Sequence, residues 1–322
     1  MSEIIIASLS SLYVLLFLFF TIGLLKTKRY KGIKATPSVS VVVPMRNEEE
    51  FAERTLEALA LQDYIGEWEV ICVDDRSTDR TKEILENLPK LKLICVTATG
   101  FDNIDTAAAK EKGVAVCNVK GYSTHSVAQV TVTLALSLMT HLPEYAKYVR
   151  QGKYTASGVQ NRLTPVFHEL YGKTWGVVGL GNIGRQVAKV AEAFGCRVIC
   201  FKRTPDSEYQ TTDLETLCKE SDIISLHLPL TDQTKEIINK KTLSIMKDNA
   251  ILINVARGAI TNEKDVADAV KAGAIGGFAT DVYSLEPLPC DSPFVSISEM
   301  PNVILTPHMA WGAFESRVRC IN

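Results

Sequence analysis

WGVVGLGNIGRQVAKVAEAFGCRVICFKR, residues 175–203, is the stretch that decides the fold of this chain. It contains an apolar run, three glycines at G-x-G-x-x-G spacing (Gly179, Gly181 and Gly184), an amphipathic run and a second apolar run. This order predicts a strand, a tight turn, a helix beginning near Asn182 and a second strand. The glycines would permit the turn, a close approach of backbone to a pyrophosphate, and tight packing of helix on strand. The stretch therefore predicts a dinucleotide-binding unit rather than a glycine-rich turn that only packs.

The rest of the chain repeats the alternation of strand and helix. Strands are expected at 38–44, 68–73, 91–97, 114–118, 222–229, 250–256 and 276–283, and helices at 48–62, 78–88, 104–112, 126–142 and 264–273. Alternation of this kind predicts parallel sheets with right-handed crossovers. We therefore expect an α/β fold with a doubly wound parallel sheet (Rossmann) domain at 121–304. A smaller flavodoxin-like α/β domain of hybrid origin is expected at 38–120, and a short C-terminal segment at 305–322.

The composition is that of a globular protein with a sizeable core. The chain has 322 residues, of which 46% are hydrophobic and 22% charged, and its net charge of -2 gives no reason to expect nucleic acid as a partner. The 8 cysteines include no C-x-x-C pair and no cluster with histidine at zinc-ligand spacing, so no metal site is expected. Free thiols favour a cytoplasmic location.

The N-terminus departs from this pattern. Residues 4–25 carry no charged side chain, and a helix of this length can cross about 30 Å of hydrocarbon. Five basic residues follow within the next ten positions, and this flank predicts that the C-terminal side stays in the cytoplasm. A single transmembrane helix is therefore expected, in preference to a signal peptide or a buried core helix.

From about Leu91 onward the chain resembles the D-isomer-specific 2-hydroxyacid dehydrogenases. The resemblance rests on ordered motifs: ATGFDNID at 98–105, NVKGYSTHSVAQ at 118–129, GVVGLGNIG at 176–184, LHLPLT at 226–231, NVARG at 254–258, TDVYSLEP at 280–287 and TPHMAWG at 306–312. It implies hydride transfer between a nicotinamide cofactor and a small 2-keto or 2-hydroxy acid. The stretch after TPHM is similar to hydroxypyruvate reductase and glycerate dehydrogenase members, which makes that substrate pair the leading expectation.

The segment before about residue 88 resembles the start of a membrane-anchored family 2 glycosyltransferase. VSVVVPMRNEEE at 39–50 and EVICVDDRSTDRT at 69–81 carry this resemblance, which implies nucleotide contacts by Asp74 or Asp75. No D-x-D motif follows, and departure of a nucleotide diphosphate needs such oxygen ligands for its metal. Sugar transfer is therefore not favoured. The alternatives to the dehydrogenase are a membrane-anchored nucleotide-sugar glycosyltransferase fragment and an inactive fusion that only binds dinucleotide. A gene-fusion or assembly artefact near residue 90 is the alternative to a natural hybrid domain.

Three residues are expected to carry the chemistry. His308 is the candidate proton donor, because imidazole exchanges protons near neutral pH. The resemblance implies that Glu286 bonds the other ring nitrogen, where an anion stabilises the imidazolium and fixes its orientation. Arg257 offers a permanent, fork-shaped cation for the carboxylate and carbonyl oxygens of a substrate. Glutamate at position 286 also differs from the glutamine of the formate dehydrogenase branch.

The remaining expected contacts concern cofactor and substrate. The predicted cofactor-binding residues are Gly179, Gly181, Asn182, Ile183, Gly184, Lys202, Arg203, Ala256 and Asp281, the last through the nicotinamide carboxamide. Lys202 stands where NAD enzymes place a carboxylate, and Lys202 with Arg203 would suit a 2′-phosphate, so NADP is favoured with NAD left open. Backbone groups of Thr99 and Gly100 would hold the substrate carboxylate. The resemblance also implies a homodimer formed through the dinucleotide domain, where the 121–145 segment would project.

Overall fold

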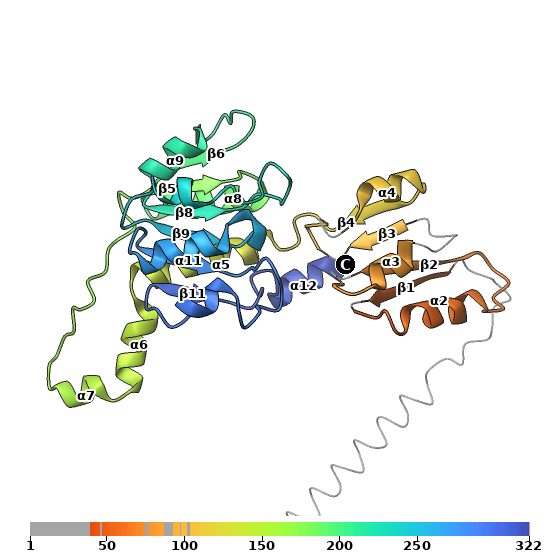
Figure 1. Cartoon of the computed structure of the whole chain (residues 1–322), viewed down its shortest axis with the longest axis horizontal. Coiled ribbons are helices and arrows are strands. Elements are labelled where there is room, and N and C mark those ends of the chain that lie inside the picture. The colour runs from red at the N-terminus through yellow and green to blue at the C-terminus, as the bar shows by residue number, and fades with distance from the viewer. Residues whose placement is uncertain are drawn as a thin grey trace, which may run out of the picture. The chain divides into compact units, whose positions relative to one another are not determined.

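The computed structural model describes residues 39–45, 47–74, 77–86, 93–96, 98–101 and 104–321. The transmembrane helix predicted at residues 4–25 lies outside these ranges. Within them, no helix is both long enough and apolar enough to cross a membrane. The described strands form two parallel sheets, each of which is described by itself below (Figure 1).

The larger sheet has seven strands in the order β11-β10-β9-β8-β5-β6-β7. The strands are β5 (Thr174–Val178), β6 (Arg197–Phe201), β7 (Gln210–Thr211), β8 (Ile223–Leu226), β9 (Ile251–Asn254), β10 (Gly277–Thr280) and β11 (Val303–Leu305), and all pairs are parallel. The chain runs outward from β5 through β6 and β7, and then returns to add β8 on the other side of β5. This reversal is a topological switch point, where open α/β sheets bind ligands. The predicted doubly wound sheet is confirmed.

Helices cover both faces of this sheet because the side chains of its strands are apolar on both faces. One apolar cluster joins the strands to α5 (Thr124–Met139) and α8 (Asn182–Ala193). A second cluster joins them to α9 (Leu214–Glu220), α10 (Lys240–Leu243) and α11 (Glu263–Lys271). Two 3-10 helices, η1 (Gly258–Ile260) and η2 (Pro293–Ile297), and the C-terminal α12 (Phe314–Ile321) complete this part.

The smaller sheet has the strand order β1-β2-β3-β4. Its elements are β1 (Val39–Met45), α2 (Ala52–Ala60), β2 (Trp68–Asp74), α3 (Thr81–Glu86), β3 (Leu93–Val96), α4 (Thr106–Glu111) and β4 (Ala115–Asn118). The expected flavodoxin-like order is wrong for the described strands, since that order places the second strand outside the first. Here each crossover advances by one strand in the same direction. The smaller sheet therefore contains no switch point among its described strands.

The helix predicted at 126–142 is α5, which ends three residues earlier than predicted. α5 ends at Met139, His141 adopts a left-handed conformation with φ 50°, and α6 (Leu142–Arg150) begins with a proline in its first turn. Proline is tolerated there because the first N–H groups of a helix have no intrahelical partner. α7 (Lys153–Ser157) follows, and both short helices extend away from the layers around the large sheet (Figure 1). Neither was predicted.

Candidate functional site

The glycine-rich loop joins β5 to α8, and each of its glycines has a separate steric reason. Gly179 has φ 101°, and a Cβ there would lie 2.8 Å from the carbonyl group of His227. A Cβ on Gly184 would lie 2.1 Å from the carbonyl oxygen of Gly179, so only glycine lets α8 pack this close to the loop. A Cβ on Gly181 would meet no described atom within 4 Å. Gly181 therefore borders the open space that a pyrophosphate would need.

The start of α8 supplies the polar part of the same cradle. Gly181 is the N-cap, and its carbonyl oxygen accepts the first helical hydrogen bond from the N–H of Arg185 at 2.9 Å. The N–H groups of Asn182 and Ile183 lie in the first turn, where backbone donors lack helical partners and the helix dipole is positive. This geometry fits an anionic pyrophosphate, which is the group that the sequence predicts here.

Three predicted site residues follow three adjacent strands. Arg257 lies just beyond β9, Asp281 directly after β10, and His308 just beyond β11. The register pairs Asn254 with Thr280 and Thr280 with Leu305, so the carboxyl ends of these strands lie side by side. Strand order thus brings together side chains that are far apart in the sequence. They line one edge of the sheet that also carries the glycine-rich loop.

His308 is oriented by Glu286. Its Nδ1 lies 2.6 Å from Oε2 of Glu286, and the other carboxylate oxygen accepts a hydrogen bond from the backbone N–H of Tyr283 at 3.0 Å. The hydrogen bond from Tyr283 therefore fixes the orientation of the carboxylate that contacts the imidazole ring. Because Nδ1 is bound to Glu286, proton exchange with a substrate would go through Nε2. His308 itself has φ 53°, a left-handed conformation that is uncommon for a residue with a side chain.

Asp281 holds the backbone on both sides of His308. Its carboxylate accepts hydrogen bonds from the hydroxyl of Thr306 at 2.6 Å, from the N–H of Met309 at 2.9 Å and from the N–H of Ala310 at 2.8 Å. Only 1% of the residue is exposed, so these contacts lie in a dry environment where hydrogen bonds to a carboxylate are strong. The predicted contact of Asp281 with nicotinamide stays a prediction. The hydrogen bonds to the segment around His308 could not be read from the sequence.

The segment that carries Arg257 is fixed by Asn254, which is fully buried. The side chain of Asn254 accepts a hydrogen bond from the N–H of Ala256 at 3.1 Å and donates one to the carbonyl oxygen of Arg257 at 2.9 Å. A Cβ on the next residue, Gly258, would lie 1.9 Å from the carbonyl carbon of Tyr283. Glycine at this position therefore lets the Arg257 segment pack directly against the segment that leads to Glu286.

The predicted ribose-binding end of the site contains a carboxylate that sequence reasoning missed. Lys202 follows β6, and its Nζ lies 3.0 Å from Oδ2 of Asp206. Arg185, on the first turn of α8, forms an ion pair with the same carboxylate and a second one with Glu208 at 2.9 Å. Arg203 is exposed. The sequence carried no signal of this cluster, because Lys202 and Asp206 lie in a loop, where an i, i+4 spacing does not predict contact.

His227 is a second residue that the sequence did not single out. It follows β8 at the switch point, and its Nε2 lies 3.0 Å from the hydroxyl of Ser225, which accepts a hydrogen bond from the indole N–H of Trp175 at 2.9 Å. Burial lowers the pKa of His227 to about 3, so the ring is neutral near pH 7. Its Nδ1 is buried and finds no partner among the described residues. Because this imidazole is neutral, it cannot contribute a positive charge to the binding of an anion.

The remaining predicted residues lie on the smaller sheet. Thr99 and Gly100 follow β3, where the side chain of Asn118 donates to the carbonyl oxygen of Thr99 at 2.6 Å. Asp74 ends β2, and Asp75 lies outside the described residues. Hydrogen bonds join the segments that follow β1 and β2, such as that from the N–H of Thr78 to Oδ1 of Asn47 at 2.8 Å.

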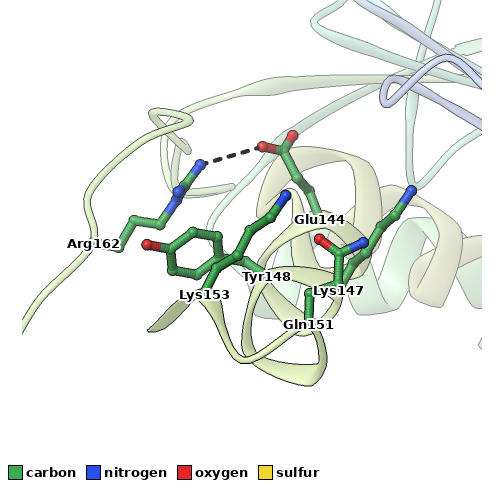
Figure 2. Close-up of a pocket in the computed structure, with 6 residues that line it drawn as sticks. All are labelled: Glu144, Lys147, Tyr148, Gln151, Lys153 and Arg162. Atoms are coloured by element: carbon green, nitrogen blue, oxygen red, sulfur yellow. Dashed lines mark ion pairs between the residues drawn. The ribbon is translucent and has the colours of Figure 1, made fainter. Parts of the chain in front are cut away.

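A pocket of about 360 Å³ lies apart from these residues, on α6 and α7 (Figure 2). Its lining consists of Glu144, Lys147, Tyr148, Gln151, Lys153 and Arg162. The guanidinium of Arg162 lies 3.9 Å from the ring centre of Tyr148 and 3.8 Å from Glu144, so its charge is partly balanced within the pocket. No residue predicted for cofactor, substrate or catalysis lines this pocket. Among the described residues no group of side chains that could hold a metal ion is found.

Two related proteins align with most of the length of this chain. A glycerate dehydrogenase of Methylorubrum extorquens is 40% identical over 234 residues, which is 73% of this chain and 74% of the relative. A hydroxypyruvate reductase of Thermotoga maritima is 37% identical over 277 residues, which is 85% of this chain and 88% of the relative.

Solved structures agree with the fold. An NADPH-dependent glyoxylate/hydroxypyruvate reductase from Sinorhizobium meliloti, in complex with NADP and malonate, aligns with a TM-score of 0.72 at 26% identity and covers 89% of this chain and 90% of that one. A D-lactate dehydrogenase from Aquifex aeolicus, complexed with NAD and lactic acid, gives 0.72 at 29% identity and covers 88% and 92%.

Two family models match different parts of the chain. Residues 40–122 match glycosyl transferase family 2, as the motifs at 39–50 and 69–81 predict. Residues 132–310 match the NAD-binding domain of D-isomer specific 2-hydroxyacid dehydrogenase, a span that includes the glycine-rich loop, Arg257, Glu286 and His308. More than half of the chain lies in this second match. The chain belongs to the D-isomer specific 2-hydroxyacid dehydrogenases.

Proposed function

We propose that the protein is an NAD(P)-dependent oxidoreductase that interconverts small 2-keto and 2-hydroxy acids, with hydroxypyruvate and glycerate as the favoured pair. The observation that carries the proposal is the His308–Glu286 pair at 2.6 Å, placed at the same sheet edge as Arg257 and the dinucleotide cradle. The named activities of the relatives from Methylorubrum and Thermotoga support the choice of substrate.

In this mechanism a bound reduced nicotinamide would supply a hydride to the carbonyl carbon, and the chain binds and polarises the substrate. Arg257 pairs with the substrate carboxylate and with the carbonyl oxygen on which negative charge develops. His308 gives a proton to that oxygen as the alcohol forms, and Glu286 stabilises the ring while it is charged. Asp281 keeps His308 in place through the backbone. Thr99 and Gly100 are proposed to bind the substrate carboxylate from the smaller domain.

The assay that tests this proposal follows the loss of reduced-nicotinamide absorbance with hydroxypyruvate, glyoxylate and pyruvate in turn. We expect turnover with all three and the highest kcat/KM with hydroxypyruvate. Intact dinucleotide binding without turnover above background would contradict an oxidoreductase, and would leave a fusion that only binds dinucleotide. The segment at 40–122 supports no second activity here, because no D-x-D motif follows it.

The role of Asp281 gives a separate prediction. Asp281→Asn replaces one carboxylate oxygen by an NH₂ group, which sets a donor against at least one of the three donors that now bind this side chain. Losing such a buried bond costs about 1–3 kcal/mol, so we expect kcat to fall about tenfold to a hundredfold. Dinucleotide affinity measured by titration should change by less than about threefold, because the lost hydrogen bonds hold the segment around His308 and not the dinucleotide cradle. A fall in affinity that matches the fall in kcat would point instead to a nicotinamide contact.

We also propose that the protein is a homodimer. Exposed apolar side chains gather beyond α5 in the segment 142–171 and include Leu142, Val149, Leu163, Val166, Phe167 and Tyr171. One face of α5 packs in the core, and the exposed apolar residues begin at α6, whose first residues fall within the predicted segment 121–145. Several exposed apolar side chains in one segment support an interface there. A monomer in sedimentation equilibrium would contradict the proposal. The membrane anchor at residues 4–25 stays a prediction from the sequence.

A further inference from the structure

The ion-pair cluster at the carboxyl end of β6 joins the helix of the dinucleotide cradle to the loop that follows the strand. Asp206 lies at its centre, since its carboxylate pairs with both Lys202, at 3.0 Å, and Arg185. Glu208 pairs with Arg185 only, at 2.9 Å. The backbone N–H of Glu208 also donates to Asp206 at 3.1 Å, which fixes the loop around this carboxylate.

The four side chains differ in exposure. Only 3% of the Asp206 side chain is exposed, whereas Lys202, Arg185 and Glu208 keep 29%, 34% and 64% of theirs. The ammonium group of Lys202, the N–H of Glu208 and the guanidinium of Arg185 hold the pKa of Asp206 well below its usual range. The carboxylate is therefore ionised at neutral pH. A ligand at this end of the site would meet the two cations and not the carboxylate beneath them.

We infer that Asp206 sets the cofactor preference: by holding Lys202 and Arg185 in ion pairs, it weakens the binding of a 2′-phosphate relative to a 2′-hydroxyl. The inference rests on the proposed function and on the expectation from the sequence that Lys202 lies at the adenosine ribose. Asp206 acts through its two cations and is a positioning residue. It makes the ribose end less favourable to NADP than the sequence Lys202-Arg203 suggests.

The charges explain the direction of the effect. Asp206 is paired with both cations, so neither is free to attract a 2′-phosphate while this carboxylate is in place, and removal of Glu208 leaves both pairs intact. To bind Lys202 the phosphate must also compete with a carboxylate that is already desolvated and in contact. A 2′-hydroxyl carries no charge and needs neither cation. Removal of Asp206 therefore favours the phosphate and leaves the hydroxyl almost unaffected.

The test is a direct titration of the full chain with NADPH and with NADH, without substrate. In Asp206→Asn we expect NADPH to bind about tenfold more tightly relative to wild type, and NADH to change by less than about threefold. Asp206→Ser is the second variant, with the same expected shift, and thermal unfolding verifies that each variant is folded. Glu208→Gln is the matched control: it removes an equal charge from the same loop but leaves Lys202 paired, and should shift the ratio by less than about twofold.

A double variant shows whether the effect passes through Lys202. Lys202→Met should lower NADPH affinity more in the Asp206→Asn background than in wild type, because only there is the ammonium released. An equal loss of both dinucleotides in Asp206→Asn would mean that Asp206 only maintains the loop. A selective loss of NADH would mean that Asp206 binds the ribose hydroxyl. An unchanged ratio, or an equal shift in Glu208→Gln, would also overturn the inference.

Failure of the proposed function gives a different result. If wild type binds neither dinucleotide, the proposed function and the inference fall together. If wild type binds both and turns over no keto acid, the proposed oxidoreductase fails while the ratio in Asp206→Asn still decides the inference. The two conclusions are thus judged by separate readings on the same protein.

Discussion

His308→Gln is expected to lower kcat for hydroxypyruvate about a hundredfold to ten-thousandfold, which is the usual contribution of a positioned acid or base. Glutamine can reach Glu286 and donate a hydrogen bond to it, but it cannot give up a proton near neutral pH. The residue lies 2.6 Å from the Glu286 carboxylate and is not part of the dinucleotide cradle. Dinucleotide affinity should therefore stay within about threefold of wild type.

The control for His308 is His168→Gln, which makes the same substitution at an exposed site in the segment proposed for the dimer, outside the residues predicted for catalysis, cofactor and substrate. Steady-state kinetics should show no change there beyond about twofold. Glu286→Gln adds a graded variant, since a neutral partner still orients the ring but no longer stabilises its charge. We expect its kcat to lie between those of wild type and His308→Gln. Full activity in His308→Gln would exclude this histidine as the proton donor.

Arg257→Lys is expected to lower kcat/KM for 2-keto acids about a hundredfold. Lysine keeps the charge but loses the planar fork that binds a carboxylate through two parallel hydrogen bonds. Because Arg257 is proposed to polarise the carbonyl as well as to bind the carboxylate, both kcat and KM should change. Steady-state kinetics with hydroxypyruvate over a range of concentrations separates the two parameters.

Chemical rescue distinguishes this role from a structural one. In Arg257→Ala, millimolar guanidinium should restore part of the lost kcat/KM, because the added cation can enter the space left by the side chain. Arg197→Ala is the control: Arg197 lies on the same sheet but pairs with the exposed Glu220, and its variant should neither lose activity nor respond to guanidinium. An Arg257→Ala enzyme within threefold of wild type would show that another cation binds the substrate.

Local elements of the site could be predicted because their causes are local. The spacing of Gly179, Gly181 and Gly184 predicts a helix from about Asn182, and α8 begins at that residue. Turn geometry and helix capping depend on a few neighbouring residues, which the sequence displays directly. The turn at His141 was missed although Pro143 marks the start of the next helix. There the apolar pattern of α5 outweighed a single proline.

The sequence by itself determined the dinucleotide unit, the family motifs and the identities of Arg257, Glu286 and His308. Only the tertiary structure decided that Asp281 binds the backbone around His308 and that Asp206 binds both Lys202 and Arg185. It also decided the order of the smaller sheet. The physical reason is that Asp281 and Met309, and likewise Asp206 and Arg185, are far apart in the sequence and become adjacent only when the strands that precede them take their places in the sheet. The order in which strands pair depends on the packing of the whole sheet and cannot be predicted from any one position of the chain.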